Sequence, residues 1–235
     1  MTERKIVKSG IPGLDKILDG GFLQGSVITI GGPTGAGKSS FAMQFLYEGA
    51  RKLNEPGLYI SIEESRESML FHMSGYKWDI GKAEKEHKLM FLDYPVYEID
   101  QFLEQSGAIQ EIINTNGIKR VVIDSIMPIA LFFPNEEKRK RGFLKFIDNV
   151  RKWGTTTFII SEDTTVSDFD AIPNTNYGIE SFTDGWINIY YRPEPKKKNE
   201  RVRMIEVLKM KGTQHSLKVY PVTVGDTGFD IKVKK

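Results

Sequence analysis

One stretch of the chain decides its fold: Gly32-Pro33-Thr34-Gly35-Ala36-Gly37-Lys38-Ser39. It matches in full the pattern of a glycine, four residues and then Gly-Lys-Ser. The apolar, β-branched residues 26–30 before it are typical of a buried strand, and residues 41–47 after it suit a helix. A glycine-rich loop between a strand and a helix turns its backbone N–H groups into one concavity at the positive end of the helix. The sequence therefore predicts a binding site for the phosphates of a nucleoside triphosphate.

The end of this loop carries two side chains with chemistry of their own. Lys38 is placed to reach the β- and γ-phosphates, and the Ser39 hydroxyl is a ligand for Mg²⁺, which would bridge phosphate oxygens. An accidental glycine-rich turn would not require the correct strand and helix on its two sides. We assign the binding of ATP or ADP to Gly32, Pro33, Thr34, Gly35, Ala36, Gly37, Lys38, Ser39 and Ser40.

Composition limits the remaining classes of function. The 235 residues, 40% of them hydrophobic and 27% charged, are enough for one domain with a full core. Lys and Arg number 33 against 31 Asp and Glu, so charge gives no argument for a nucleic-acid partner. The absence of cysteine excludes disulfides and cysteine-ligated zinc, and with three histidines the expected metal is Mg²⁺. Since no apolar stretch has the length of a membrane span and no signal region follows Met1, we expect a cytoplasmic protein without membrane insertion.

Strand and helix patterns alternate along most of the chain. Further strands are expected at residues 58–62, 89–92, 120–124 and 155–160, and helices at residues 66–74, 99–114 and 136–153. This alternation predicts an α/β fold with a mostly parallel central sheet and helices on both faces. The nucleotide then belongs at the carboxyl ends of the strands.

The pattern changes after residue 180. Residues 186–191 and 202–209 are expected to form a hairpin, followed by a strand near residues 219–224. These strands predict a C-terminal antiparallel extension of the sheet. We therefore divide the single expected domain, residues 1–235, into an N-terminal segment (1–25), a core (26–180) and the hairpin extension (181–235).

Asp124 is the candidate second ligand of the metal. It ends the apolar strand that contains residues 121–123, so it should emerge at the same sheet edge as the phosphate-binding loop and hold Mg²⁺ through water. A carboxylate after a strand is also a common helix cap, and Ser125 could serve in either role. The phosphate-binding loop favours the metal role.

Glu63 and Glu64 follow directly on another strand. ATP hydrolysis needs a carboxylate near the γ-phosphate to orient a water molecule and take its proton. Because adjacent residues of an extended segment face opposite ways, only one of the two can point at the γ-phosphate. The sequence does not say which one, and a capping pair at the start of the next helix is the alternative.

Two basic runs, residues 138–141 and 196–198, could contact nucleic acid. Aromatic side chains that would stack on bases are not interleaved with them. Glu136 and Glu137 can offset the first run locally. Solvated helix and loop faces are therefore favoured, and a nucleic-acid partner is possible but not favoured.

Several stretches together resemble the KaiC-like branch of the RecA superfamily. They are residues 10–15, 20–21, 32–39, 62–64, 78–79, 120–125, 177–180 and 208–215. The resemblance implies a RecA-like P-loop NTPase that assembles into a hexameric ring with ATP at the subunit interfaces. The paired catalytic glutamates of that family match Glu63 and Glu64.

The resemblance also implies a set of residues that act on the nucleotide of a neighbouring subunit. Lys209, Lys211, Thr213 and His215 match this segment, and Asp226 matches an aspartate on the ribose side. Lys209 and Lys211, two apart in a strand, share one face, which could also simply be an exposed strand face. Position 211 often holds arginine in the family, and because lysine lacks the bidentate fork of arginine we expect slow hydrolysis.

The function that we expect is a Mg²⁺-dependent, oligomeric, slow ATPase that switches its conformation or its partner binding. One alternative is a recombination-type DNA-binding ATPase or mediator. Another is a nucleotide-sensing scaffold for a motility machine, as in some archaeal relatives. Binding to single-stranded DNA with a steep salt dependence would favour the first alternative.

Overall fold

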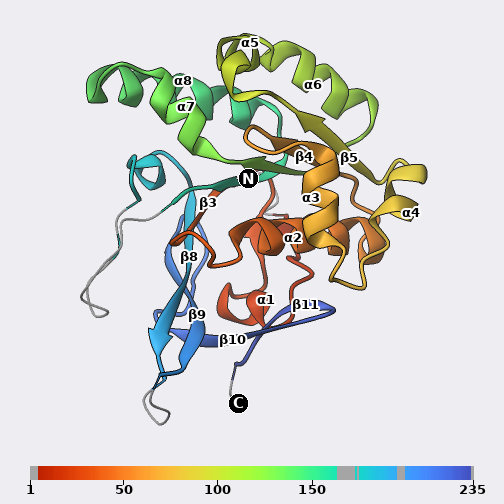
Figure 1. The fold of residues 1–235 in the computed structure, drawn as a ribbon, viewed down its shortest axis with the longest axis vertical. Coiled ribbons are helices and arrows are strands. Elements are labelled where there is room, and N and C mark those ends of the chain that lie inside the picture. The colour runs from red at the N-terminus through yellow and green to blue at the C-terminus, as the bar shows by residue number, and fades with distance from the viewer. Residues whose placement is uncertain (1–4, 163–172, 174, 195–198, 234–235) are drawn as a thin grey trace.

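Strands from most of the chain form one sheet, in the order β11-β10-β9-β8-β3-β7-β6-β4-β5 (Figure 1). The computed structural model describes residues 5–162, 173, 175–194 and 199–233. Neighbours from β8 to β5 pair in parallel, whereas β8 to β11 pair antiparallel. The strands are β3 (Val27–Gly31), β4 (Gly57–Ser61), β5 (Leu89–Asp93), β6 (Arg120–Asp124), β7 (Thr156–Ile160), β8 (Gly185–Pro193), β9 (Arg201–Met210), β10 (Tyr220–Gly225) and β11 (Gly228–Ile231). This architecture confirms the predicted parallel sheet and its antiparallel extension.

Helices cover both faces of the sheet, as the buried strands require. Figure 1 shows α5 to α8 on one face and α1 to α3 on the other. The helices are α1 (Leu14–Ile17), α2 (Lys38–Lys52), α3 (Arg66–Met73), α4 (Ile80–Lys85), α5 (Ile99–Glu104), α6 (Ser106–Thr115), α7 (Ile126–Phe132) and α8 (Glu136–Lys152). Short 3₁₀ turns are η1 (Val96–Glu98) and η2 (Ile179–Ser181), and β1 (Ile6–Val7) pairs with β2 (Phe22–Leu23).

The core consists of two apolar layers that the sheet separates. Along β4, Tyr59 packs in the layer under α2, whereas Leu58 and Ile60 pack in the layer under α5 to α8. Successive side chains of a strand point to opposite faces, so every strand in the middle of the sheet serves both layers. This explains why the residues of β3, β4 and β7 are buried throughout.

Three features of the helices differ from the expectation, and one of them is α4, a helix of six residues that was not predicted. The predicted helix 99–114 is broken at Gln105 into α5 and α6, because Gln105 (φ −82°, ψ 14°) leaves the helical region. The helix α7 was not expected, since it has only seven residues and contains Pro128. Proline is tolerated in the first turn of a helix, where the backbone N–H has no partner in the helix.

The N-terminal segment contains β1, α1 and β2. Leu14 and Ile17 of α1 are buried in the layer under α2. In the part of the chain that the structure describes, no helix has both the length and the apolar character needed to cross a membrane.

Candidate functional site

The phosphate-binding loop lies between β3 and α2, at the carboxyl edge of the parallel strands. Gly32 has φ 143°, and a Cβ there would lie 2.0 Å from the carbonyl oxygen of Ile189. Gly37 has φ 93°, and a Cβ there would lie 2.8 Å from the ring of Phe229. Both positions require glycine because of backbone conformation and lack of space. The predicted order of strand, loop and helix is confirmed.

Lys38 is the first residue of α2, and its side chain folds back over the loop. Its Nζ donates hydrogen bonds to the carbonyl oxygens of Gly32 (2.8 Å) and Pro33 (3.1 Å). The side chain is buried, so its ammonium group is held where the loop would surround a phosphate. Lysine acts on phosphate as a point charge, and the bonds to the loop fix its position.

Asp124, at the end of β6, is brought together with Ser39 of α2. The Asp124 carboxylate accepts hydrogen bonds from the Ser39 hydroxyl and from the hydroxyl of Tyr59 (2.5 Å). Burial raises the pKa of Asp124, and the two hydrogen bonds and the nearby Lys38 ammonium lower it in part. A buried carboxylate of this kind is stabilised further by a cation at the same place.

These oxygens fit a magnesium ion that is held largely by phosphate and water. Ser39 offers a hydroxyl and Asp124 a carboxylate, both hard ligands that Mg²⁺ accepts. Among the described residues there is no group of three or more His, Cys, Asp or Glu that could hold a metal without a substrate. The donor set is therefore that of a metal that enters with a nucleotide.

Glu63 faces the loop. Its carboxylate accepts a hydrogen bond from Ser125, the residue after Asp124. Partial burial raises the pKa of Glu63, the charges of Asp124 and Glu162 raise it further, and the Ser125 bond and the Lys38 charge oppose this rise. An elevated pKa suits a general base that works near neutral pH.

Glu64 is hydrogen-bonded to residues of α3. Its Oε1 accepts hydrogen bonds from the hydroxyl of Ser68 (2.5 Å) and from Nδ1 of His72 (2.7 Å). The two neighbouring carboxylates therefore have different surroundings. The Glu63 carboxylate lies within electrostatic reach of the Lys38 ammonium, and the charge of Glu64 acts on Asp124.

Sequence reasoning missed some of the residues that contact the loop, Glu162 and Arg203 among them. Glu162 follows β7 by two positions, and its carboxylate accepts a hydrogen bond from Thr34 (2.9 Å). The guanidinium of Arg203 lies over the rings of Tyr191 (5.0 Å) and Phe229 (5.5 Å), beside Gly37. The rule that found Asp124, an acid after an apolar strand, would also have found Glu162. No local pattern marks Arg203, because β9 approaches the loop only through the fold.

Lys209 and Lys211 lie at the opposite edge of the sheet. Met210 pairs with Gly185 at the start of β8, whereas the loop follows Gly31 at the far end of β3. The Nζ of Lys209 donates to the Glu180 carbonyl (2.8 Å), and the Nζ of Lys211 lies 3.5 Å from Oδ1 of Asp184. Burial, and then the charge of Lys211, lowers the pKa of Lys209. The structure thus separates both lysines from the phosphate-binding loop of their own chain.

The other residues expected at a neighbour's nucleotide fall into two places. Thr213 and His215 follow β9, and their Oγ1 and Nε2 atoms are buried without a hydrogen-bond partner in the described part of the chain. Asp226 instead lies in the turn between β10 and β11, exposed, with an ion pair to Lys77 (2.6 Å). The structure does not bring Asp226 to the two lysines, because β10 runs antiparallel to β9 and ends near its start.

The first basic run is paired within its own helix. In α8, Lys140 lies 2.6 Å from Glu136, and Arg141 lies 2.7 Å from Glu137. These i,i+4 pairs offset the charge that a nucleic acid would meet. The second run, residues 196–198, lies outside the described residues.

Sheet, loop and acidic residues together define a P-loop nucleotide-binding protein with a RecA-type fold. The sequence model of the KaiC ATPase matches residues 7–235. The chain belongs to the KaiC family of ATPases.

Similarity to known proteins covers nearly all of the chain. It is 32% identical to a UPF0273 protein of Methanocaldococcus jannaschii, over 96% of this chain and 95% of that one. It is 30% identical to the circadian clock oscillator protein KaiC of Prochlorococcus marinus, over 97% of this chain, but it spans only 47% of that relative. The crystal structure of a KaiC-like protein of Pyrococcus horikoshii is similar with a TM-score of 0.84 and 34% identity, over 98% and 100% of the two chains.

Proposed function

We propose that this chain is a cytoplasmic, Mg²⁺-dependent ATPase that hydrolyses ATP slowly as a hexameric ring and uses the ATP-to-ADP change to switch its conformation or partner binding. One observation carries the proposal: Lys38, Ser39, Asp124 and Glu63 converge at one sheet edge. Together they offer a cation that binds the phosphates, two metal ligands and a base. These are the parts that phosphoryl transfer to water needs.

In the proposed reaction each residue has one role. Lys38 and the loop N–H groups would hold the β- and γ-phosphates, and Ser39 and Asp124 would hold Mg²⁺, which would neutralise charge on the phosphates. Glu63 orients a water molecule and takes its proton as the water oxygen attacks phosphorus. The bond between phosphorus and the bridging oxygen breaks, and ADP leaves with the electron pair of that bond.

The neighbouring subunit would complete the site with Lys209 and Lys211. Support comes from their position at the opposite edge of the sheet, from which they cannot reach the loop of their own chain. A head-to-tail contact between the two edges closes into a ring if its rotation permits. Lysine at position 211 supplies a charge without a bidentate fork, which supports slow turnover.

Calorimetry on Lys38→Ala tests the nucleotide site. Because Lys38 supplies the cation at the β- and γ-phosphates, the variant should bind ATP at least tenfold more weakly, a loss of about 1.4 kcal/mol. Lys82→Ala, an exposed change on α4, should bind ATP as the parent does. Equal ATP affinity of a folded Lys38→Ala variant and the parent would refute the assignment.

A further inference from the structure

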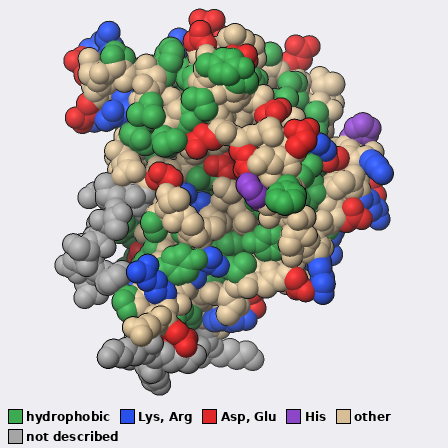
Figure 2. Space-filling view, in the orientation of Figure 1, with side chains coloured by type: hydrophobic (Ala, Val, Ile, Leu, Met, Phe, Trp, Pro, Cys, Tyr) green, Lys and Arg blue, Asp and Glu red, His purple; other side chains and the backbone are tan. Residues whose placement is uncertain are grey.

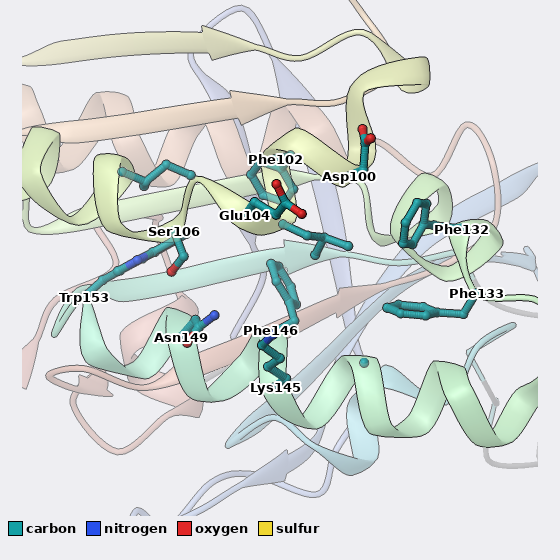
Figure 3. A pocket seen from close by; sticks show the side chains of 13 residues that line it. Asp100, Phe102, Glu104, Ser106, Phe132, Phe133, Lys145, Phe146, Asn149 and Trp153 are labelled. Carbon is teal, nitrogen blue, oxygen red and sulfur yellow. The ribbon is translucent and has the colours of Figure 1, made fainter.

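A cavity of about 490 Å³ lies on the sheet face opposite to α2, between α5, α6, α7 and α8 (Figure 3). This volume is in the range of pockets that hold small molecules. Its apolar wall is formed by Phe102, Leu103, Ile109, Phe132, Phe133 and Phe146, and the charged residues Asp100, Glu104 and Lys145 line it as well. The proposed function gives this cavity no role, since it lies in the other core layer from the helix that follows the phosphate-binding loop.

The aromatic wall is packed and preformed. The rings of Phe102 and Phe146 lie 6.1 Å apart, and those of Phe132 and Phe133 lie 5.4 Å apart at 80°. A Cβ at Gly142 would lie 2.0 Å from the Phe133 ring, so this ring rests on the backbone of α8. Phe132 is nevertheless 49% exposed, and Figure 2 shows hydrophobic side chains gathered over α5 and α7. A ligand can therefore enter without unfolding the wall.

The end of the cavity at Trp153 carries uncharged polar groups. Trp153, Ser106 and Asn149 lie together there, away from Phe132 and Phe133 (Figure 3). Trp153 is only 5% exposed, and its indole Nε1 has no hydrogen-bond partner among the residues that the structure describes. An indole N–H can only donate, and a buried donor without an acceptor is costly. This end of the cavity is suited to a hydrogen-bond acceptor.

The helix α7 joins the cavity to the nucleotide site. Its N-cap residue, Ser125, donates a hydrogen bond to the Glu63 carboxylate and accepts one from the N–H of Met127. Its last residue is Phe132, which with Phe133 forms the aromatic end of the cavity. Seven helical residues span about 10 Å, so α7 connects the residue bonded to Glu63 with the cavity wall.

We propose that this cavity binds a small aromatic molecule that carries a hydrogen-bond acceptor, and that α7 couples its occupancy to the nucleotide site. The aromatic body packs against Phe132, Phe133 and Phe146, and the acceptor takes the Trp153 N–H. Aromatic pairs in offset or edge-to-face contact add to the stabilisation that burial provides. The coupling rests on the proposed function, whereas the binding does not.

Nuclear magnetic resonance tests the binding half, with 2-acetylnaphthalene as the probe and ¹⁵N-labelled tryptophan. The indole signal of Trp153, assigned by its loss in Trp153→Phe, should shift with saturation as the ketone oxygen accepts its N–H. Asn149→Phe fills the cavity and should abolish this shift, whereas Leu144→Phe, on the exposed side of the same helix, should preserve it. No shift in the parent, or the same shift in Asn149→Phe, would overturn the binding site.

Calorimetry then tests the donor and the coupling. Trp153→Phe should bind the probe about tenfold more weakly, as expected for one lost hydrogen bond. Probe affinity should differ between the ATP–Mg²⁺ and ADP–Mg²⁺ states, and the probe should change ATP relative to ADP affinity by the same factor. Equal probe affinity in the ATP–Mg²⁺ and ADP–Mg²⁺ states would refute the coupling but not the binding site. ATP binding is measured in the same titrations, so its failure refutes the proposed function, and the coupling with it.

Discussion

Glu63 and Glu64 are adjacent in the chain but have different hydrogen-bond partners, and we propose Glu63 as the base. Glu63 faces Lys38 and is bonded to Ser125, while Glu64 is bonded to Ser68 and His72 on α3. We expect Glu63→Gln to lower kcat by about 10²- to 10⁴-fold, as for loss of a general base, with ATP affinity nearly unchanged. Glu64→Gln, the matched control, should keep most of the turnover.

Steady-state hydrolysis and calorimetry on the two variants check this difference. The base contributes mainly in the transition state, so its removal should spare binding of the ground state. A larger loss of kcat in Glu64→Gln than in Glu63→Gln would reverse the assignment of the base.

Ser125 should set the acidic limb of the pH–rate profile. Glu63 acts as a base only when ionised, so the rate falls as the pH falls through its pKa. Burial raises this pKa, and the Ser125 hydrogen bond lowers it. Ser125→Ala removes the lowering contribution, and the acidic limb should move to higher pH. Ser68→Ala is the control: it removes the hydroxyl that is bonded to Glu64 and should leave the pH of the acidic limb unchanged. If the acidic limb of Ser125→Ala lies at the same pH as that of the parent, or at a lower pH, Ser125 does not have this role.

Among the candidate site residues, those that belong to a short sequence motif could be predicted from the sequence. Lys38 and Ser39 stand in a loop whose spacing is fixed by phosphate geometry, and Asp124 ends an apolar strand. The pattern could not choose between Glu63 and Glu64, because that choice depends on the hydroxyl groups of Ser68 and Ser125, which the fold brings to them.

The buried side chain of Arg120 joins three elements. At the start of β6, its guanidinium donates to the Glu55 carboxylate (2.6 Å), to the Phe45 carbonyl of α2 (2.9 Å) and to the carbonyls of Lys8 (2.6 Å) and Ser9 (3.1 Å). Arg120→Met would leave these buried oxygens without their donor. We expect the free energy of unfolding to fall by about 3 kcal/mol, by the cost of buried unpaired groups.

Urea denaturation of the nucleotide-free protein measures this loss. Arg141→Met is the matched control, because the two side chains of the Arg141–Glu137 ion pair are 79% and 75% exposed. Such pairs contribute about 0–1 kcal/mol. Equal effects of the two substitutions would show that Arg120 does not hold the N-terminal segment to α2 and β6.

Helix periodicity shows the limit of prediction at the scale of elements. The apolar spacing of residues 99–114 continues through Gln105, since Phe102 and Ile109 pack into the same layer of the core. Periodicity therefore does not reveal that the backbone turns between α5 and α6. That turn matters, because α5 and α6 form one side of the cavity beside α8.

The whole molecule presents two unlike edges. The loop, Asp124 and Glu63 lie where the parallel strands end, and Lys209 and Lys211 lie where β8 begins. The five residues of β3 alone span about 16 Å between these edges. Sequence motifs identify the loop residues and the two lysines, but only the sheet shows that they lie too far apart to contact one nucleotide within a single chain. In the single chain, Lys209 donates to the Glu180 carbonyl and Lys211 pairs with Asp184. In a ring, the two lysines would contact phosphate instead of these partners.

A mixing experiment tests the shared site. Lys38→Ala rings lack the loop ammonium group that binds the phosphates. Rings of the double variant Lys209→Ala/Lys211→Ala lack the cations that would come from the neighbour. Each should be inactive alone. When subunits of the two exchange in equal amounts, about a quarter of the interfaces combine an intact loop with an intact lysine pair, and activity should return in that proportion.

Native mass spectrometry establishes that mixed rings have formed, and steady-state hydrolysis measures their activity. A surface pair on α4, Lys82→Ala/Lys85→Ala, is the matched double variant and should hydrolyse ATP as the parent does. Each subunit of a mixed ring supplies either the loop or the lysines, so restored activity can arise only at interfaces between different subunits. Mixed rings without activity, or monomers that hydrolyse ATP as fast as rings, would show that each chain carries a complete site.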